Sequence, residues 1–253
     1  MASRTLLPTA PRTPRTRFSD FDWLIYGAPG VGKTTLGSKF PSPYFLATED
    51  GTKAIESWRS DVESWADFLA LTEALRTEPH DFRSVIVDTV DLLYPMCLQS
   101  VCDDLGVAHP SDAEWGKGWQ TLRNRWTSGI NRLRTSKRAD GSPMCIVFVS
   151  HESTSPIRIK RGRQLIETGR YHVSSALSGK SREILHSSVD FILRAEMDGD
   201  VRQLRTQPGE HEQYDIECKG RGRAGAMLPQ LVPMDFSALL RAFNANLGAT
   251  KEQ

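Results

Sequence analysis

The chain has few cysteines, no long apolar run and almost no net charge. Its four cysteines among 253 residues form no C-x-x-C pair and have no histidine at metal-ligand spacing, which argues for a reducing cytosol and against structural zinc. No apolar run approaches the ~20 residues of a membrane-spanning helix, and no signal peptide is recognisable, so a cytoplasmic protein without a membrane partner is expected. A formal net charge of +1 means that a polyanionic partner must be bound by a local basic patch.

Length and composition fit one α/β domain. With 39% hydrophobic and 25% charged residues, the chain can bury one full core but not a second large domain. Residues 1–17 contain four arginines, three prolines and no acid, a composition that predicts a mobile basic arm. We therefore expect an arm at 1–17, one domain at 18–247 and a short tail at 248–253.

Residues 27–34 read Gly-Ala-Pro-Gly-Val-Gly-Lys-Thr and match the pattern G-x-x-x-x-G-K-S/T. An apolar segment precedes them and a helix-compatible one follows, as in the strand, loop and helix of a P-loop nucleotidase. Glycines allow consecutive backbone N–H groups to wrap a phosphate. Lys33 is expected to contact the β- and γ-phosphates, and Thr34 is expected to bind Mg²⁺. The predicted nucleotide-binding residues are Gly27, Ala28, Pro29, Gly30, Val31, Gly32, Lys33, Thr34 and Thr35.

Short apolar strands alternate with amphipathic helices over the first 150 residues, which predicts an α/β fold with a mostly parallel twisted sheet and helices on both faces. The expected strands are 21–26, 44–47, 85–88 and 145–149, and the expected helices are 34–40, 62–77 and 91–105. The last hundred residues predict a C-terminal β-meander at 189–195, 201–206 and 213–219, followed by a helix from Asp235.

A longer helix is expected after residue 114. Ser111 and Glu114 form a capping box before it. The tryptophans at 115, 119 and 126 are expected in the core or in a subunit interface. One face of the helix is marked by Trp119, Leu122, Trp126, Ile130 and Leu133.

Polar residues follow three of the predicted strands. Asp88 ends the third strand, where a carboxylate can hold Mg²⁺ beside the phosphate loop or cap the next helix. Glu49 and Asp50 follow the second strand, where a carboxylate can polarise a water molecule or lie in a solvated turn. His151 follows the fourth strand, either as a sensor of the γ-phosphate or as a structural histidine. Asp91 is expected to be the N-terminal acid of its helix.

This order of motifs resembles the RecA-type ATPase core. It is most similar to small phage RecA-like proteins, the nucleotide-binding or Sak-four single-strand annealing ATPases, and residues 115–119 and 219–229 also fit that group. The resemblance covers residues 21–240. It implies a RecA-like fold, Mg²⁺-dependent ATP hydrolysis and a role in phage recombination or strand annealing, in the host cytoplasm. The implied partners are single-stranded DNA, further copies of the chain and a single-strand-binding protein.

By position, the resemblance also assigns catalytic roles. Lys33 would be the phosphate-binding cation, Glu49 the water-activating acid, Asp88 the Mg²⁺ acid and His151 the γ-phosphate sensor. The family pattern is Thr-Glu-Gly, whereas here Asp50 follows Glu49 directly. Asp50 is therefore an alternative base.

Residues 153–182 hold seven basic residues and one acid, with no clear apolar period. This predicts a long, partly mobile loop or hairpin that contacts DNA phosphates, with Tyr171 and His172 available to stack on an unpaired base; the alternative is a solvated basic loop. Lys219 and Arg221 are expected to act as finger-like cations on a phosphate, in the same chain or across a subunit boundary, or to form a nucleic-acid-binding edge. The predicted DNA-binding residues are Arg158, Lys160, Arg161, Arg163 and Arg170.

Two other functions fit the same residues. A P-loop small-molecule kinase would use the basic segment as a lid, and a nucleotide-gated scaffold would bind ATP with little turnover. Stimulation of turnover by single-stranded DNA, as opposed to a nucleoside or nucleotide acceptor, separates the ATPase from the kinase. Tight ATP binding without turnover identifies the scaffold.

Overall fold

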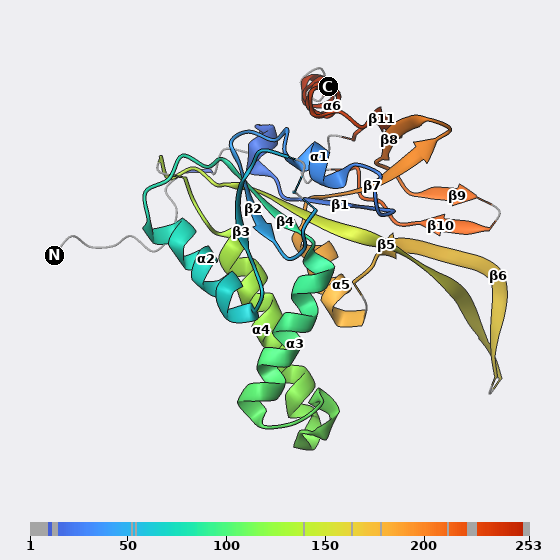
Figure 1. Ribbon diagram of the computed structural model, residues 1–253. Coiled ribbons are helices and arrows are strands. Elements are labelled where there is room, and N and C mark those ends of the chain that lie inside the picture. Colours follow the sequence, from blue (N-terminus) through green and yellow to red (C-terminus); the bar gives the residue numbers. More distant parts are fainter. Residues whose placement is uncertain are drawn as a thin grey trace.

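The computed structural model describes residues 10–11, 15–51, 53, 55–138, 140–162, 164–177, 179–211, 213–221 and 227–249. Its strands are β1 (Trp23–Gly27), β2 (Pro43–Ala47), β3 (Trp58–Asp61), β4 (Ser84–Asp88), β5 (Cys145–Arg161), β6 (Gln164–Ser175), β7 (Phe191–Asp198), β8 (Val201–Arg205), β9 (Gly209–His211), β10 (Tyr214–Ile216) and β11 (Leu231–Pro233). Its helices are α1 (Lys33–Gly37), α2 (Trp65–Thr77), α3 (Val90–Leu105), α4 (Lys117–Arg134), α5 (Gly179–Ser188) and α6 (Phe236–Ala249) (Figure 1).

The parallel part of the sheet has the strand order β3-β2-β4-β5-β1-β7. The expected RecA-like α/β class, a mostly parallel sheet flanked by helices, is confirmed. Parallel strands share a common direction, so the segments that follow β1, β2 and β4 meet at one edge of the sheet. Strand β5 lies between β1 and β4 and runs on past this edge, so His151, which is level with Gly27 of β1, lies between the loop after β1 and the acid that ends β4.

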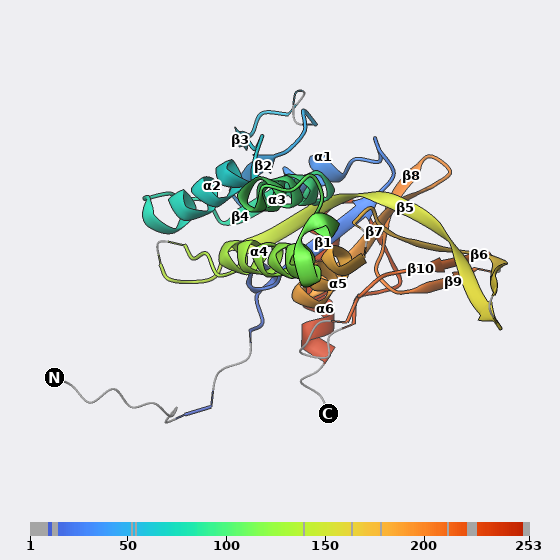
Figure 2. The ribbon, with the colours of Figure 1, turned by 90° about the horizontal axis from the view of Figure 1, so that it is seen from below.

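Helices cover both faces of this sheet, with α1 and α6 above it and α2 to α5 below it in Figure 1; Figure 2 looks onto the face with α2 to α5. Helices α2 to α5 lie on one face, where Phe68 and Trp126 are buried in the same cluster as Leu24 of β1. Helices α1 and α6 lie on the other face, where Phe243 is buried with Trp23 of β1. Neighbouring residues of β1 therefore face opposite cores, which explains why the strand is apolar at every position instead of alternating.

Several element boundaries differ from those expected. The capping box of Ser111 and Glu114 is wrong, because two 3₁₀ turns, Pro110–Asp112 and Glu114–Gly116, occupy that segment and Gly116 precedes α4. Trp115 is 100% exposed and Trp119 is 43% exposed, so neither belongs to the core. The buried face of α4 consists of Leu122, Trp126, Ile130 and Leu133, with the glycines at 118 and 129.

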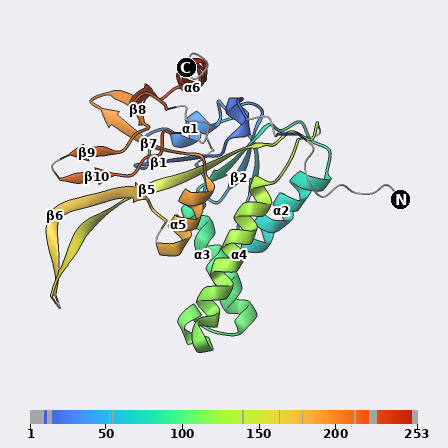
Figure 3. The ribbon, with the colours of Figure 1, turned by 180° about the vertical axis from the view of Figure 1, so that it is seen from behind.

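The basic segment forms a hairpin. Strand β5 does not end at residue 149 but continues to Arg161 and pairs with β6 in antiparallel register. These two strands, called here the ribbon over residues 154–173, extend away from the body of the molecule (Figure 3). Tyr214–Ile216 pairs in parallel with β6 and not with β8. The expected three-stranded meander is thus a β7–β8 hairpin followed by a second hairpin, β9–β10, whose strand β10 joins the ribbon.

The chain ends differ slightly from the expected arm and tail. Within the described part of the arm, Arg17 forms an ion pair with Asp20 at 3.2 Å. Helix α6 runs to Ala249, two residues beyond the expected end of the domain at residue 247. None of the helices in the described part of the chain combines the length and the apolar character that crossing a bilayer requires.

Candidate nucleotide site

The loop between β1 and α1 forms a backbone cradle. Gly30 and Gly32 have φ angles of +76° and +106°, values that residues with a Cβ atom rarely adopt. Gly27 has no room for a side chain, because a Cβ there would lie 2.3 Å from the carbonyl oxygen of Ala195. The three glycines are thus required by conformation or by close packing. They leave backbone N–H groups free to bind phosphate oxygens.

Lys33 lies inside this loop. Its ammonium group donates hydrogen bonds of 2.9 Å to the carbonyl oxygens of Gly27 and Ala28, and the residue is buried. Burial lowers the pKa of Lys33, while the nearby Asp88 carboxylate opposes that change. The loop therefore holds a pre-positioned cation where phosphate groups would lie.

Asp88 ends β4 directly beside the loop. Its Oδ2 accepts a hydrogen bond of 2.7 Å from the hydroxyl of Thr34, and its Oδ1 is buried with no hydrogen-bond partner. Burial raises the pKa of Asp88, and the bond from Thr34 counteracts this. A carboxylate oxygen without a donor, beside a threonine hydroxyl, is a ligand set that Mg²⁺ prefers, so these two residues fit that ion.

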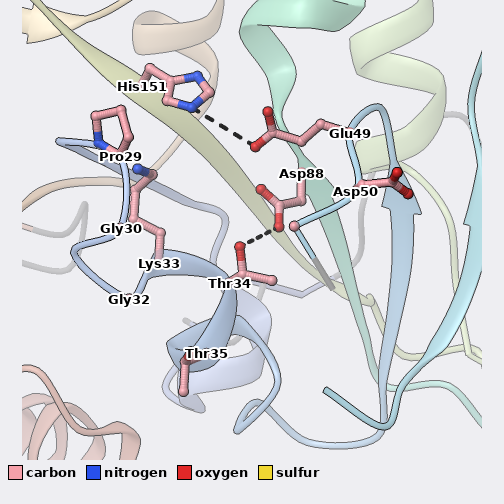
Figure 4. Close-up of a pocket in the computed structure, with 11 residues that line it drawn as sticks. Pro29, Gly30, Gly32, Lys33, Thr34, Thr35, Glu49, Asp50, Asp88 and His151 are labelled. Carbon is pink, nitrogen blue, oxygen red and sulfur yellow. Dashed lines mark hydrogen bonds and ion pairs between the residues drawn. The ribbon is translucent and has the colours of Figure 1, made fainter. Parts of the chain in front are cut away.

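Glu49, His151 and Asp91 form a second polar chain beside the same cleft, and Figure 4 shows the first two of them. His151 Nδ1 lies 2.8 Å from Asp91 Oδ2, and the backbone N–H of His151 donates to Asp91 Oδ1 at 3.1 Å. His151 Nε2 lies 3.8 Å from Glu49 Oε1. Because a carboxylate only accepts, Asp91 holds the proton on Nδ1 and directs Nε2 toward Glu49.

The contact between Asp91 and His151 is what the sequence reasoning missed. Asp91 was expected only as the N-terminal acid of its helix, and it does lie in the first turn of α3. It lies only three residues after Asp88, the last residue of β4, and this short distance from a strand end is the signal that indicates a second carboxylate at the same edge of the sheet.

The two candidate bases lie in different surroundings. Burial raises the pKa of Glu49, and His151 partly offsets that rise. Asp50 is instead paired with Lys53 at 2.6 Å and with Arg59 at 3.5 Å, and the hydrogen bond from Lys53 lowers its pKa. Figure 4 shows the Glu49 carboxylate directed at His151 and the Asp50 carboxylate directed away from Lys33.

Two cavities flank the loop. The first has a volume of about 450 Å³ and is lined by Pro29, Gly30, Gly32, Lys33, Thr34, Thr35, Glu49, Asp50, Gly51, Asp88 and His151. The second, of about 960 Å³, lies on the side of β7 and β8. Arg202 borders it, and the Arg202 Nη1 lies 3.3 Å from the position of a Cβ built on Gly32. Arg202 is thus a second cation at the loop that no sequence motif marked.

The other predicted site residues lie elsewhere. Arg158, Lys160, Arg161 and Arg170 are on the ribbon, whereas Arg163 lies outside the described residues. Lys219 donates a hydrogen bond of 2.5 Å to the carbonyl oxygen of Val189. Val189 precedes β7, at the sheet edge opposite the P-loop, so Lys219 does not reach the phosphate loop of its own chain. Arg221 is exposed and forms an isolated bridge with Met227.

A phosphate loop after β1, an acid at the end of β4 and a histidine in β5 where that strand passes between them define a P-loop nucleotide-binding ATPase domain. The chain belongs to the AAA_24 family of AAA domains, which matches residues 20–215.

Two further proteins are similar to this chain. The SPbeta prophage-derived uncharacterized protein YorG of Bacillus subtilis (strain 168) is 27% identical over 133 residues, which are 50% of this chain and 39% of that protein. This chain therefore matches only about two fifths of the length of that relative. A prototypical ATPase from the type III secretion system of pathogenic bacteria has a TM-score of 0.43 and 12% identity, over 70% of this chain and 51% of that one; this likeness is too slight to add to the assignment.

Proposed function

We propose that the protein hydrolyses ATP and binds single-stranded DNA, as a Sak-four-type annealing or recombination ATPase. Its proposed partners are single-stranded DNA, further copies of the chain and a single-strand-binding protein. The similarity to a prophage-derived protein supports a phage setting. The motif order supports the recombination role.

In this proposal Glu49 takes the proton of the attacking water. Its carboxylate is partly buried, lies on the cleft beside Lys33 and Asp88 and contacts His151. Lys33 and the loop N–H groups bind the phosphates and stabilise the charge that develops on them. Thr34 and Asp88 would hold Mg²⁺, which neutralises phosphate charge when bound. Asp91 positions His151, whose Nε2 can respond to the γ-phosphate or to Glu49.

The observation that carries the DNA proposal is the continuity of β5. One strand contains His151 in the nucleotide cleft and Lys160 near the tip of the ribbon, with a shift in its pairing with β6 between Pro156 and Arg158. Nine residues of extended chain span about 30 Å. A displacement of His151 by a bound nucleotide therefore has a direct structural route to the ribbon.

The ribbon has the charges that a polyanion requires. Arg158 is paired with Glu167 at 2.9 Å, whereas no ion pair of Lys160, Arg161 or Arg170 is recorded within the described part of the chain. The register places Arg158 opposite Glu167 and Lys160 opposite Leu165, with Arg161 one residue further on and therefore on the other face. Because cations lie on both faces, a nucleic-acid strand that wraps around the ribbon can contact more of them than a strand that lies flat on one face.

The ribbon does not serve the competing kinase function well, because it points away from the P-loop and does not cover it (Figures 1 and 3). The test is ATP turnover measured alone, with single-stranded DNA and with a panel of nucleoside acceptors. We expect DNA to raise turnover and the acceptors to leave it unchanged. Phosphate transfer to an acceptor would establish the kinase instead, and tight ATP binding with no turnover in any condition would establish the scaffold.

A further inference from the structure

A third cavity, of about 530 Å³, lies at the base of the ribbon and shares Arg194 and Arg205 with the second cavity beside the phosphate loop. Its floor is one face of the small sheet formed by β5, β6, β10 and β9. The strand register aligns four residues in one row across that face: Thr154, Val173, Ile216 and Gly209. All four line the cavity. A pocket of this volume is in the range that holds small organic ligands.

The next row of the same face carries an aromatic pair. Tyr171 and Tyr214 are directly opposite each other on β6 and β10, with ring centroids 6.0 Å apart. Both side chains are 39% exposed, and Tyr214 lines the cavity. An exposed pair of rings beside a cavity is a platform on which a planar group can stack.

The arginines that line the cavity from β7 and β8 are neutralised by Glu152 of β5 and Glu196 of β7. Arg194 donates to Glu152 at 2.7 Å and to Glu196 at 2.7 Å, and Arg205 donates to Glu196 at 2.8 Å. Two arginines and two glutamates leave no surplus positive charge there. A free phosphate would therefore find no unpaired cation here, whereas a neutral planar ring can stack on tyrosine or guanidinium planes and hydrogen-bond to Thr154 or Glu152.

We propose that this cavity receives an unpaired nucleobase of single-stranded DNA bound along the ribbon. The proposal rests on the proposed DNA-binding function and adds a base-binding site to it. Tyr171 and Tyr214 stack bases at the mouth, and the base that enters contacts Arg194 and Glu152. Glu152 directly follows His151 in β5, so a base in the cavity contacts the strand that leaves the nucleotide cleft.

The test compares an oligothymidine with the same oligomer after removal of its bases, so that phosphates remain and bases do not. We expect the full-length wild-type chain to bind the base-bearing oligomer about tenfold more tightly, as loss of a stacked base predicts. Tyr214→Ala should remove most of this difference, and Tyr214→Phe should retain it. Thr154→Trp should also remove it, because the indole fills the cavity from an exposed position. Trp58→Ala, which removes an exposed ring on β3, is the matched control.

The salt dependence separates this proposal from the function on which it rests. If the site is correct, the slope of affinity against salt concentration stays unchanged in Tyr214→Ala and Thr154→Trp, because the phosphate contacts remain. Retention of the base preference in both variants, or its absence from wild type, would overturn the base site but leave DNA binding intact. Failure of wild type to bind either oligomer at any salt concentration would overturn both.

Discussion

The two halves of β5 differ in almost every physical property although they form one strand. The half at Cys145–Ser150 is buried on both faces and lies between β1 and β4, whereas the half beyond Thr154 is mostly exposed and pairs only with β6. His151 lies where one half meets the other. The buried half fixes the nucleotide cleft, because a residue with strands on both sides cannot shift without moving its neighbours. The exposed half is free to bind a large ligand.

Strand β5 thus connects the nucleotide cleft, where side chains are fixed, with the ribbon, where side chains are exposed. In the cleft, polar groups are held by specific partners, such as Asp91 on His151 and Thr34 on Asp88. On the ribbon, the cations that lack an ion pair within the described residues can form one with a ligand. Substitutions in the cleft should therefore have large effects on turnover, and substitutions on the ribbon should act on DNA alone.

The largest effect is expected from Lys33→Ala. Removal of the cation that lies in the phosphate loop should reduce ATP turnover to background, because no other ammonium group lines the described cleft. Steady-state ATPase assays on the folded variant measure this. Lys39→Ala removes the same charge from an exposed position and should leave turnover unchanged. Normal turnover in folded Lys33→Ala would contradict the assignment of the loop.

Glu49→Gln should lower turnover by about 10²-fold while ATP·Mg²⁺ still binds, because it removes the base and keeps the shape of the side chain. Single-turnover hydrolysis and equilibrium ATP binding separate the two effects. Asp50→Asn is the matched control, since Asp50 is turned toward Lys53 and Arg59. The reverse result would make Asp50 the base.

On the exposed half, replacement of Lys160, Arg161 and Arg170 by alanine should weaken single-strand binding and flatten its salt dependence. About 0.7 units of log–log slope are expected per lost phosphate contact, or roughly 2 units in all. Titrations at several salt concentrations measure the slope. Basal ATP turnover should not change; its loss would mean that the ribbon acts on the nucleotide as a lid.

A smaller effect is expected from Arg202→Ala. The guanidinium lies beside Gly32 at the phosphate loop, so its loss should weaken nucleotide binding by about fivefold, less than for a buried charged hydrogen bond because the side chain is exposed. Calorimetric titration with ATP measures the change. Arg202→Lys should recover part of the affinity, and equal affinities in all three proteins would remove Arg202 from the site.

The smallest and most diagnostic effect concerns pH. A general base is active as the carboxylate, and burial raises the pKa of Glu49. Turnover should therefore rise with pH, and the rise should be centred above the usual range of glutamate pKa values. With Asp50 as the base, whose pKa is lowered, the rise would instead be centred below the usual range of aspartate pKa values. A pH–rate profile distinguishes the two candidate bases. This rise of turnover with pH should be absent from Glu49→Gln.

The residues of the nucleotide cleft were predicted from the sequence more accurately than the strand pairing of the ribbon. The P-loop, Asp88 and the buried strands were predictable because each depends on local residue type and spacing. The contact of Asp91 with His151 and the approach of Arg202 to Gly32 were not, because they join residues 60 and 170 positions apart. Their geometry depends on sheet order, which periodicity does not encode.

The extent and the pairing of the ribbon strands could not be predicted from the sequence either. Apolar content predicted the end of β5 at residue 149, since hydropathy reports burial and not backbone pairing. The strand nevertheless continues because β6 supplies its hydrogen bonds. In the same way, residues 214–216 have the pattern of a meander strand, but their partner β6 lies about forty residues earlier in the chain.

In the proposed function, β5 couples the nucleotide cleft to the ribbon. This coupling is tested by the dissociation constant for single-stranded DNA, measured without nucleotide and with a saturating non-hydrolysable ATP analogue, in wild type and in His151→Ala. We predict that the analogue changes the wild-type affinity severalfold, and that this change disappears in His151→Ala while nucleotide-free DNA affinity stays the same. Identical DNA affinity with and without the analogue in wild type, or an undiminished change in His151→Ala, would contradict the coupling.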